Sequence, residues 1–382
     1  MILLSGPNVS GNEWKYVKEC LDTGWVSSVG SYVNKFEQMV AEFAGAKYGI
    51  AASCGTAALH ISLLLSGVRR DDYVIVPNVT FVASANSICY TGARPLFVDI
   101  DPETWQMDLD LLESVLAAET YIKDGQCYLI KDDRRISAIM PVHVLGNMCD
   151  MDRLVDIANR YRLVAVEDST EALGSTFKGK HAGTFGRFGT FSFNGNKIIT
   201  TGGGGVIVTD DEALAKRAKH ITTTAKSDSF EYIHDEVGYN YRLVNVLAAM
   251  GVAQMEQLPK FLERKKQIDS FYRNELQGLG DIRFQKIPSD VNPNRWLFTF
   301  QTQKQKEVLK ALNDNGMQSR PFWVPMNQLE MFKNDVYMSD RNSSRKVYST
   351  CLSIPSSTYI TDAEMQSIVS TIKSCFQPNA AT

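Results

Sequence analysis

The residues best suited to chemistry are an aspartate and a lysine that each follow an apolar, β-rich run. Asp168 ends the run Leu163–Asp168, and Lys197 comes after Gly189-Thr-Phe-Ser-Phe and a short turn of small residues. Open α/β folds bind ligands at the carboxyl ends of their strands. An amine and a carboxylate at one such edge match the needs of pyridoxal phosphate (PLP). The lysine amine forms a Schiff base with the cofactor aldehyde, and the carboxylate keeps the pyridine nitrogen protonated.

Each of these two residues also has an ordinary interpretation. Most lysines are solvated surface charges, and an aspartate at a strand end most often caps a helix. Lys197, however, lies in an apolar, glycine-rich stretch in which a free ammonium would be poorly hydrated. Buried lysines have lowered pKa values and serve in Schiff bases, so the stretch favours a chemical role for Lys197.

The elements that must position these residues alternate between strand and helix. Short β-rich runs cover 48–52, 73–76, 95–99, 136–142 and 163–168, and helical patterns cover 57–65, 84–90 and 151–161. Strands separated by helices indicate βαβ units and a largely parallel sheet. The sequence therefore predicts an α/β fold with Asp168 at the carboxyl edge of this sheet.

The pattern changes after Thr200. A strand is expected at 205–209, helices at 212–220 and 244–258, a basic amphipathic stretch at 260–273, a strand at 295–301, and helices at 304–313 and 360–376. Because α and β segments are mixed beyond Pro259, we predict a large domain over residues 1–258 and a small one over 259–382.

Composition excludes several classes of protein. The 382 residues include 40 Lys+Arg and 43 Asp+Glu, and the net charge of −3 gives no footprint for nucleic-acid binding. No apolar run reaches the roughly 18 residues of a membrane-spanning helix, and the N-terminus lacks a basic region followed by an apolar one. Seven cysteines without a CxxC pair argue against a disulfide framework or a zinc site. A cytoplasmic location is expected.

One further stretch resembles a phosphate-binding motif, and the histidines are possible metal ligands, but neither interpretation holds. Gly174-Ser-Thr-Phe-Lys-Gly-Lys-His has the spacing of a phosphate-binding loop, but His181 stands where Ser or Thr must bind magnesium. A hairpin or turn is the better interpretation. The five histidines show no metal-ligand spacing, so no metal site is predicted, and a packed or surface role is expected for His143.

A series of motifs spread over nearly the whole chain resembles one known family. The motifs are Gly24-Trp-Val-Ser-Ser-Val-Gly, Phe36-Glu37, Gly55-Thr-Ala-Ala-Leu-His, Pro77-Asn-Val-Thr-Phe81-Val-Ala, Glu167-Asp-Ser-Thr-Glu-Ala-Leu-Gly, Phe191-Ser-Phe-Asn-Gly-Asn-Lys197, Gly238-Tyr-Asn-Tyr-Arg-Leu and Ser319-Arg-Pro-Phe-Trp. Their order resembles that of the DegT/DnrJ/EryC1/StrS nucleotide-sugar aminotransferases. Within that group the chain is most similar to enzymes that aminate C4 of UDP-linked 4-keto-6-deoxy-N-acetylglucosamine, on routes to bacillosamine- or legionaminic-type sugars.

The resemblance implies a fold-type-I aminotransferase: a large domain with a mostly parallel seven-stranded sheet, a smaller C-terminal α/β domain, and a homodimer with shared active sites. It implies that Lys197 binds PLP and transfers the proton, and that Asp168 faces the pyridine nitrogen. Gly55, Thr56, Ala57 and Ser192 would hold the phosphate. Taken alone, Gly55-Thr-Ala is also an ordinary helix start with Thr56 as its cap.

Three more residues take roles from the resemblance. Phe81 would lie against the cofactor ring, although an ordinary core phenylalanine remains an alternative. Asn240 would reach the phosphate of the neighbouring subunit, although alone it would pass for a turn residue. Glu171 stands near the phenolic oxygen, where most members have Gln and the bacillosamine-type branch tends to have Glu. A like charge there is expected to raise the pKa of Glu171.

Two other departures concern specificity. Gly203 replaces an acidic residue, again as in the bacillosamine-type branch, and Asn327 stands where family members often have His. Arg320 or Arg242 is expected to meet an anionic group of a substrate.

The resemblance implies transfer of an amino group from L-glutamate to a nucleotide-linked 4-keto-6-deoxy sugar, with the UDP-linked sugar as the first choice. Alternatives are a GDP-linked sugar of the perosamine type, a dTDP-linked sugar aminated at C3, and a PLP-binding sensor or assembly subunit without catalysis. Intact Lys197 and Asp168 argue against the last.

Overall fold

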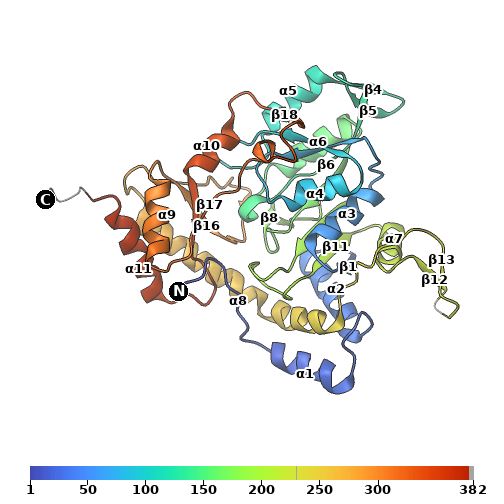
Figure 1. Ribbon diagram of the computed structural model, residues 1–382, viewed down its shortest axis with the longest axis horizontal. Coiled ribbons are helices and arrows are strands. Elements are labelled where there is room, and N and C mark those ends of the chain that lie inside the picture. Colours follow the sequence, from blue (N-terminus) through green and yellow to red (C-terminus); the bar gives the residue numbers. More distant parts are fainter. Residues whose placement is uncertain (229, 378–382) are drawn as a thin grey trace.

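A ten-stranded sheet forms the centre of the computed structural model, which describes residues 1–228 and 230–377 (Figure 1). Along the main path the strands follow the order β1-β11-β10-β7-β6-β2-β3-β18, and a β4–β5 hairpin pairs with β6. The bounds are β1 Tyr48–Ala52, β2 Tyr73–Pro77, β3 Arg94–Val98, β4 Thr120–Lys123, β5 Gln126–Leu129, β6 Arg134–Ile139, β7 Val164–Asp168, β10 Phe188–Ser192, β11 Gly205–Thr209 and β18 Val336–Met338.

From β10 through β7, β6, β2 and β3 to β18 all neighbours are parallel, whereas β11 runs antiparallel to both β1 and β10. The sequence prediction of a mostly parallel α/β sheet is therefore confirmed. Seven strands of the main path come from residues 48–209, the β4–β5 hairpin adds two more, and β18 extends the sheet from the C-terminal part of the chain, so the sheet has ten strands rather than the seven expected.

Helices cover both faces of this sheet, as the burial of β2 shows. Val74 and Val76 belong to one core cluster, together with residues of α2, α3, α4 and α7, while Tyr73 and Ile75 belong to another, with residues of α5 and α6. Strands buried on both faces are continuous apolar runs, and all five residues of β2 are buried. The helices are α1 Glu13–Thr23, α2 Ser31–Ala44, α3 Gly55–Leu65, α4 Ala83–Tyr90, α5 Leu109–Glu119, α6 Met151–Arg160 and α7 Glu212–Thr222.

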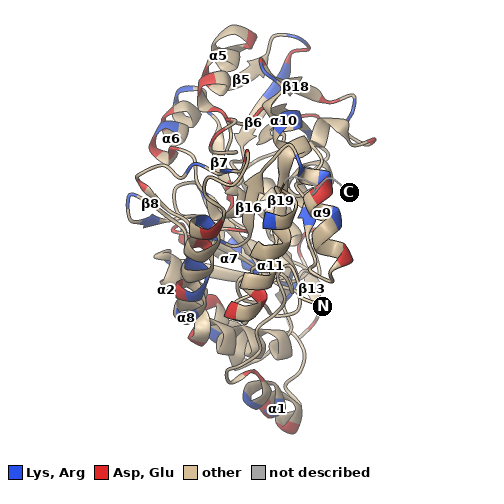
Figure 2. Ribbon diagram, turned by 90° about the vertical axis from the view of Figure 1, so that its left-hand side faces the viewer, with Lys and Arg blue, Asp and Glu red and all other residues tan. Residues whose placement is uncertain are grey.

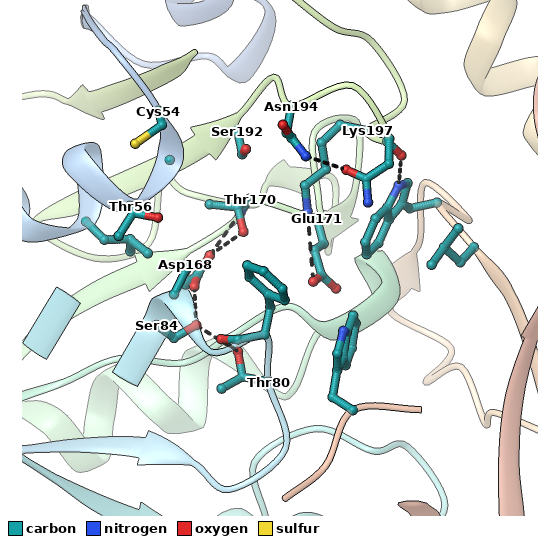
Figure 3. A pocket seen from close by; sticks show the side chains of 18 of the residues that line it. Cys54, Thr56, Thr80, Ser84, Asp168, Thr170, Glu171, Ser192, Asn194 and Lys197 are labelled. Atoms are coloured by element: carbon teal, nitrogen blue, oxygen red, sulfur yellow. Dashed lines mark hydrogen bonds and ion pairs between the residues drawn. The ribbon is translucent and has the colours of Figure 1, made fainter. Parts of the chain in front are cut away.

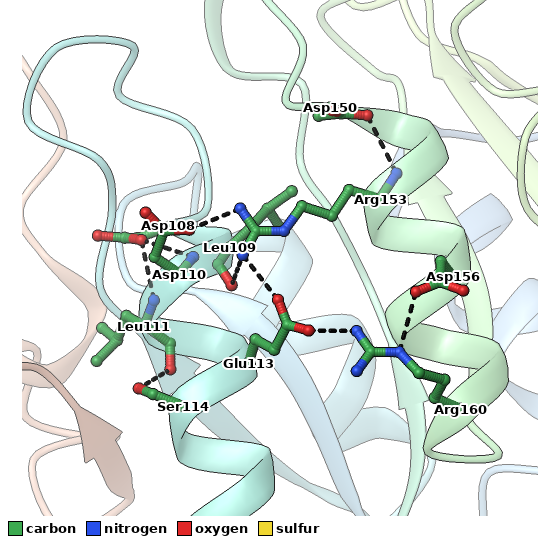
Figure 4. Close-up of polar contacts among 10 residues, drawn as sticks. All are labelled: Asp108, Leu109, Asp110, Leu111, Glu113, Ser114, Asp150, Arg153, Asp156 and Arg160. Atoms are coloured by element: carbon green, nitrogen blue, oxygen red, sulfur yellow. Dashed lines mark hydrogen bonds and ion pairs between the residues drawn. The ribbon is translucent and has the colours of Figure 1, made fainter.

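Aspartates and ion pairs fix the pair α5 and α6 (Figure 4). Asp108 and Asp150 accept backbone N–H groups as N-caps of the two helices. Arg153 on α6 reaches across to Asp110 and Glu113 of α5 at 2.6 and 2.7 Å. Such exposed pairs contribute little to stability, typically below about 1 kcal/mol each. Basic and acidic segments are interspersed over the helices in Figure 2, in keeping with the small net charge.

A second, antiparallel sheet organises the C-terminal part and is packed against its own core cluster. Its order is β14-β16-β19-β17, and α9, α11 and the end of α8 supply the apolar side chains that cover it. The elements are α8 Asn245–Leu276, β14 Arg283–Phe284, β16 Phe298–Gln301, α9 Gln305–Asp314, β17 Arg320–Pro321, α10 Ser343–Thr350, β19 Cys351–Ile354 and α11 Asp362–Ser374. The N-terminal residues also pack here, since Ile2 bridges to Met317 and Leu4 N–H donates to Gln318.

The expectation that a helix ends at Leu258 is wrong. Helix α8 runs unbroken through Pro259 and links the two sheets in Figure 1. A proline inside a helix costs about 3 kcal/mol. Here the helix is buried on both sides of the proline, through Leu258 in the large core and Tyr272 in the small one, so packing outweighs that cost. The division at 258/259 falls inside this helix and stays a prediction, and residues 378–382 of the second unit lie outside the described residues.

Smaller elements complete the chain. Strands β8 Thr176–Phe177 and β9 Lys180–His181 form an antiparallel hairpin to which β15 Val291–Asn292 adds, which confirms the hairpin expected at 174–181. A second hairpin, β12 Lys226–Asp228 with β13 Ile233–His234, projects from the body beyond α7 (Figure 1). Short helical turns lie at Val144–Gly146 and Met326–Gln328. No helix among residues 1–228 and 230–377 is long and apolar enough to cross a membrane.

Candidate active site

One cavity of about 400 Å³ opens at the carboxyl edge of the large sheet, between that sheet and the C-terminal part. Strands β7 and β10 are parallel neighbours, with Asp168 in register with Thr190, so the end of β7 and the segment after β10 meet there. The structure brings most of the predicted site residues to its wall: Gly55, Thr56, Phe81, Asp168, Glu171, Ser192, Lys197 and Arg320.

Asp168, the last residue of β7, is 2% exposed, and neighbouring donors hold its carboxylate (Figure 3). Ser84 Oγ on α4 donates to Oδ2 at 2.6 Å. Thr170 donates to Oδ1 through its backbone N–H at 3.1 Å and its hydroxyl at 2.7 Å. Thr80 Oγ1 lies 2.7 Å from Ser84 Oγ and extends the chain of hydroxyls. The carboxylate therefore has a fixed orientation at the edge of the cavity.

Lys197 lies in the segment between β10 and β11, and its side chain is 14% exposed. Its Nζ is 4.0 Å from Glu171 Oε1 and 4.0 Å from the centroid of the Trp296 ring. Burial lowers the pKa of the Lys197 amine, against the opposing charges of Glu171 and Asp168. A lowered pKa leaves more of the amine neutral, and the neutral amine is the nucleophile.

Glu171 is buried, and Leu145 N–H donates to its Oε2 at 2.8 Å. Burial raises the pKa of Glu171 to about 7, although Lys197 and the Leu145 N–H lower it. Removal from water is the main cause, and the charge of Asp168 adds to it. The further effect of the cofactor's phenolic oxygen stays a prediction. The carboxyl is therefore able to hold or release a proton near neutral pH beside the lysine amine.

The N-terminus of α3 faces the same cavity. The N-cap is Cys54, whose Sγ accepts the Ala57 N–H at 3.4 Å, rather than Thr56. The first N–H groups of a helix have no partner within it, so those of Gly55 and Thr56 are available to an anion. Ser192, at the end of β10, stands opposite: a Cβ on Gly55 would lie 2.9 Å from Ser192 Cβ. Glycine is therefore required for the helix and the strand to approach this closely.

The remaining predicted residues have different surroundings. Phe81 is 54% exposed at the cavity, so it is not an ordinary core phenylalanine. Ala57 is buried and does not line the cavity, and neither do Asn240 and Arg242. Asn327 pairs with Asn78 through two hydrogen bonds, of 2.9 and 3.0 Å, and does not line the cavity.

His143 has the packed role expected of it. Its ring is fully buried, with Nε2 3.0 Å from Glu167 Oε2. Among the described residues, the one cluster with metal-ligand geometry is His220, Asp235 and Glu236. It lies at the surface beside the β12–β13 hairpin, where His220 and Arg217 already pair with the two carboxylates.

Sequence reasoning missed several residues that shape the site. Ser84, Thr80 and Thr170 orient Asp168, but short hydroxyl side chains have no spacing that identifies them. Trp296 and Trp323 stack with ring centroids 6.3 Å apart and form a cavity wall from the C-terminal part. Trp323 ends the Ser319-Arg-Pro-Phe-Trp motif, but no role was predicted for it, and its contact with Trp296 at the cavity cannot be predicted until the fold joins the two parts.

The residues present fit PLP. The free N–H groups of α3 with the hydroxyls of Thr56 and Ser192 suit a phosphate, and the glycine at 55 leaves the space that a Cβ would fill. A fixed buried carboxylate and a buried amine of lowered pKa stand at the same cavity, as the pyridine nitrogen and the aldehyde require.

Comparison with known proteins agrees with this chemistry. The model of the DegT/DnrJ/EryC1/StrS aminotransferase family matches residues 7–373. A GDP-perosamine synthase of Escherichia coli O157:H7 is 40% identical over 329 residues, 85% of each chain. EpsN of Bacillus subtilis (strain 168), assigned as a pyridoxal phosphate-dependent aminotransferase, is 35% identical over 381 residues, 98% of this chain and 96% of that protein.

A solved structure shares the fold. Spr1654 of Streptococcus pneumoniae, assigned as a sugar aminotransferase and solved in its PLP form, superposes with a TM-score of 0.88 at 27% identity, over 98% of both chains. The fold, the cavity at the sheet edge and the family match along nearly the whole length lead to one conclusion: this chain belongs to the DegT/DnrJ/EryC1/StrS family and is a PLP-dependent aminotransferase.

Proposed function

We propose that the protein transfers an amino group from L-glutamate to a nucleotide-linked 4-keto-6-deoxy sugar, with Lys197 and Asp168 as its catalytic residues. The observation that carries this proposal is the meeting of a buried amine and a fixed buried carboxylate at one cavity, beside a helix N-terminus suited to phosphate. When bound, PLP supplies a carrier for the amino group and a sink for electrons.

The side chains that line the cavity have separate roles in the proposed reaction. The Lys197 amine, whose pKa burial lowers, would hold the cofactor through its aldehyde and, once released, would be placed to carry a proton. Asp168, which Ser84 and Thr170 hold in place, would face the pyridine nitrogen and favour its protonated form. Glu171 lies beside Lys197 with a pKa of about 7 and takes or returns a proton there. Trp296 and Trp323 cover the cavity and exclude water.

Arg320 is the better of the two arginines for an anionic group of the substrate. It lines the cavity, and its Nη1 donates to Asn313 and to the carbonyl of Ser319, which leaves part of the guanidinium fork open. Arg242 does not line this cavity, and its Nε donates to Asn240. A diphosphate or the carboxylate of glutamate matches the donor fork of an arginine.

For the nucleotide we propose GDP, in the form of GDP-4-keto-6-deoxymannose. The support is the 40% identity to a GDP-perosamine synthase, which favours this alternative over the UDP-linked sugar that the motifs suggested. The change of preference concerns only the sugar nucleotide, because Lys197, Asp168 and the residues suited to the cofactor phosphate would serve either substrate.

We also propose that the active unit is a homodimer with shared sites. Tyr239 and Tyr241 pack against His60 of α3, with ring centroids 5.1 and 6.0 Å from the imidazole. Because successive side chains of an extended segment alternate, Asn240 between them faces the other way, into solvent. Large exposed apolar side chains mark contact surfaces. They include Trp14 and Leu21 on the outer side of α1, a helix that lies at the edge of the molecule in Figure 1 and packs on α8, and Phe230 in the β12–β13 hairpin.

A comparison of acceptors tests the function. The purified protein with L-glutamate is offered GDP-4-keto-6-deoxymannose, UDP-4-keto-6-deoxy-N-acetylglucosamine and a dTDP-linked 3-keto sugar, and kcat/KM is measured for each by mass spectrometry of the amino sugar. We expect the GDP-linked sugar to lead by at least about tenfold, or about 1.4 kcal/mol. A lead for another nucleotide contradicts the GDP assignment.

A second measurement tests L-glutamate as the amino donor. If the bound cofactor turns over to pyridoxamine phosphate with glutamate, a purely sensory or structural role is excluded. No conversion with glutamate and no product with any acceptor contradicts the whole proposal.

A further inference from the structure

Trp296 holds the lysine segment in two ways. Its indole Nε1–H donates to the carbonyl of Asn196 at 2.7 Å, immediately before Lys197. The face of the same ring lies 4.0 Å from Lys197 Nζ. Trp296 is itself 3% exposed, so its ring keeps water from one side of the amine. The position of this ring therefore affects both the backbone and the hydration of Lys197.

Lys265 binds the backbone carbonyl of Trp296. It lies on α8, is 2% exposed, and its Nζ donates to the carbonyl of Trp296 at 2.7 Å and to the carbonyl of Ser356 at 2.5 Å. Within the described part of the chain no carboxylate lies within 4.0 Å of this amine, and burial lowers its pKa to about 7. A buried amine that binds only backbone carbonyls is costly, so its position suggests a specific use.

The two carbonyls are far apart in sequence but lie at the same end of one antiparallel strand pair, in which Phe298 of β16 pairs with Ile354 of β19. Trp296 precedes β16, and Ser356 follows β19, while α8 continues from Lys265 into the large core. Lys265 thus ties the loop of Trp296 to the helix that links the two sheets. Trp296 N–H also donates to Asn294 Oδ1 at 3.1 Å, and Asn294 in turn donates to the carbonyl of Glu171 at 2.8 Å.

We propose that Lys265 is a positioning residue for Lys197, acting through Trp296: by fixing the Trp296 carbonyl, it holds the indole against the amine that binds the cofactor. The inference rests on the proposed role of Lys197. Without this anchor the ring moves more freely and water reaches Nζ. Since burial is the main cause of the lowered pKa of Lys197, better hydration raises that pKa toward its ordinary value.

The test is the pH dependence of cofactor uptake by the full-length protein after its cofactor has been removed. Stopped-flow absorbance after mixing with PLP gives a second-order rate constant, which follows the neutral fraction of the lysine amine. We expect Lys265→Met to shift the inflection of this profile upward by about one unit and to slow uptake at pH 7 about tenfold. Lys266→Met, the same change at the exposed neighbouring position on α8, should leave the profile unchanged.

Trp296→Leu and the double variant show whether the effect passes through the ring. Trp296→Leu should shift the profile in the same direction, and adding Lys265→Met should shift it no further. If the two shifts add, Lys265 acts directly by its charge or by general loosening, and the proposal is wrong. If Lys265→Met does not fold by circular dichroism, Lys265→Gln replaces it, with a smaller upward shift expected.

Lys197→Ala separates this inference from the proposed function. If Lys197→Ala takes up PLP with an unchanged profile, the assignment of Lys197 itself fails. If Lys197→Ala gives no signal while Lys265→Met matches the unsubstituted protein, only the inference about Lys265 is overturned.

Discussion

Asp168 ends a parallel strand in a cavity, and the hydroxyls of Ser84 and Thr170 hold both of its oxygens. This arrangement predicts the effect of Asp168→Asn. The neutral amide keeps the shape but cannot keep the pyridine nitrogen protonated, and the loss of a preorganised electrostatic contact costs about 3–4 kcal/mol. We expect kcat to fall by about 10²–10³-fold, measured with saturating glutamate and keto sugar.

Asp99 provides the control for this substitution. Asp99 follows β3 and is as buried as Asp168. Its carboxylate accepts hydrogen bonds from the Ser339 hydroxyl and from the N–H of Ser343, the first residue of α10. Asp99 does not line the cavity. Asp99→Asn should lower the melting temperature while kcat stays within about threefold of the unsubstituted enzyme, since no reacting group is touched. Activity of Asp168→Asn within tenfold of the unsubstituted enzyme would mean that another acid serves the cofactor.

Glu171 predicts a pH dependence of stability. Burial raises its pKa from 4.5 to about 7, so the folded protein binds a proton more tightly than the unfolded chain between those values. The free energy of unfolding therefore falls as pH rises through this window. Glu171→Gln removes the titration and should raise stability above pH 7 by on the order of 1–3 kcal/mol, with little change below pH 4.5.

Urea unfolding of the cofactor-free protein at several pH values measures this effect. Between pH 5 and 7, the free energy of unfolding should fall less with rising pH in Glu171→Gln than in the unsubstituted protein. Identical slopes in the two proteins would show that Glu171 is ionised throughout, contrary to its burial.

The sequence predicted the positions of the proposed catalytic residues better than those of the residues that hold them in place. The meeting of Asp168 and Lys197 at one sheet edge could be predicted because each follows an apolar, β-rich run, whereas their catalytic roles stay a proposal. Ser84, Thr80 and Trp296 could not be predicted, because serines, threonines and tryptophans occur throughout the chain in ordinary roles. Their function depends on hydrogen bonds and ring contacts that exist only once α4 and the C-terminal part have packed around the cavity.

At the scale of elements, the approach of α3 to β10 is the feature that suits a phosphate. Gly55→Ala would place a Cβ 2.9 Å from Ser192 Cβ and 3.2 Å from Ser192 Oγ, so the helix start and the strand end must separate. We expect the affinity for PLP, measured by fluorescence titration, to fall at least about tenfold, or about 1.4 kcal/mol.

Gly203→Ala is the matched control, because Gly203 lines the same cavity but a Cβ there meets only Ser53 O, at 3.9 Å. Its affinity should stay within about twofold of the unsubstituted protein. Equal losses in both variants would mean that any added methyl disturbs the cavity and that the close approach at Gly55 has no special role.

Helix α8 shows where local sequence signals fail. Part of the alternation of strands and helices up to Thr209 could be predicted because those elements bury their own apolar patterns, but the sequence analysis missed α1, α2, α5 and the β4–β5 hairpin. Pro259 suggested a break, yet the helix continues because its two halves are buried in different cores that lie far apart in sequence. Likewise β18 pairs with β3 in the large sheet. A strand of three residues is too short to show a pattern from which this pairing could be predicted.

At the scale of the whole molecule, the proposed sharing of sites makes a quantitative prediction. Asn240→Asp sets a carboxylate against the phosphate of the partner's cofactor, and Lys197→Ala removes the attachment point. Mixing the two impaired proteins under conditions of subunit exchange creates dimers with one doubly defective site and one intact site. With random exchange half the dimers are mixed, so activity should recover to roughly a quarter of that of the unsubstituted enzyme.

Mass spectrometry confirms that exchange has taken place. If Asn240 serves its own subunit, every site keeps a defect and mixing restores nothing. Activity no higher than the average of the two separate proteins therefore contradicts the shared site.

The central claim is that Lys197 is the amine that binds the cofactor, and one measurement tests it directly. The purified, PLP-loaded protein is reduced with borohydride, digested, and its peptides are sequenced by mass spectrometry. We predict that the pyridoxyl label lies on Lys197, in the peptide with Phe193-Asn-Gly-Asn, and that Lys197→Ala carries no label although it folds. A label on any other lysine, or an equal label in Lys197→Ala, would contradict the account.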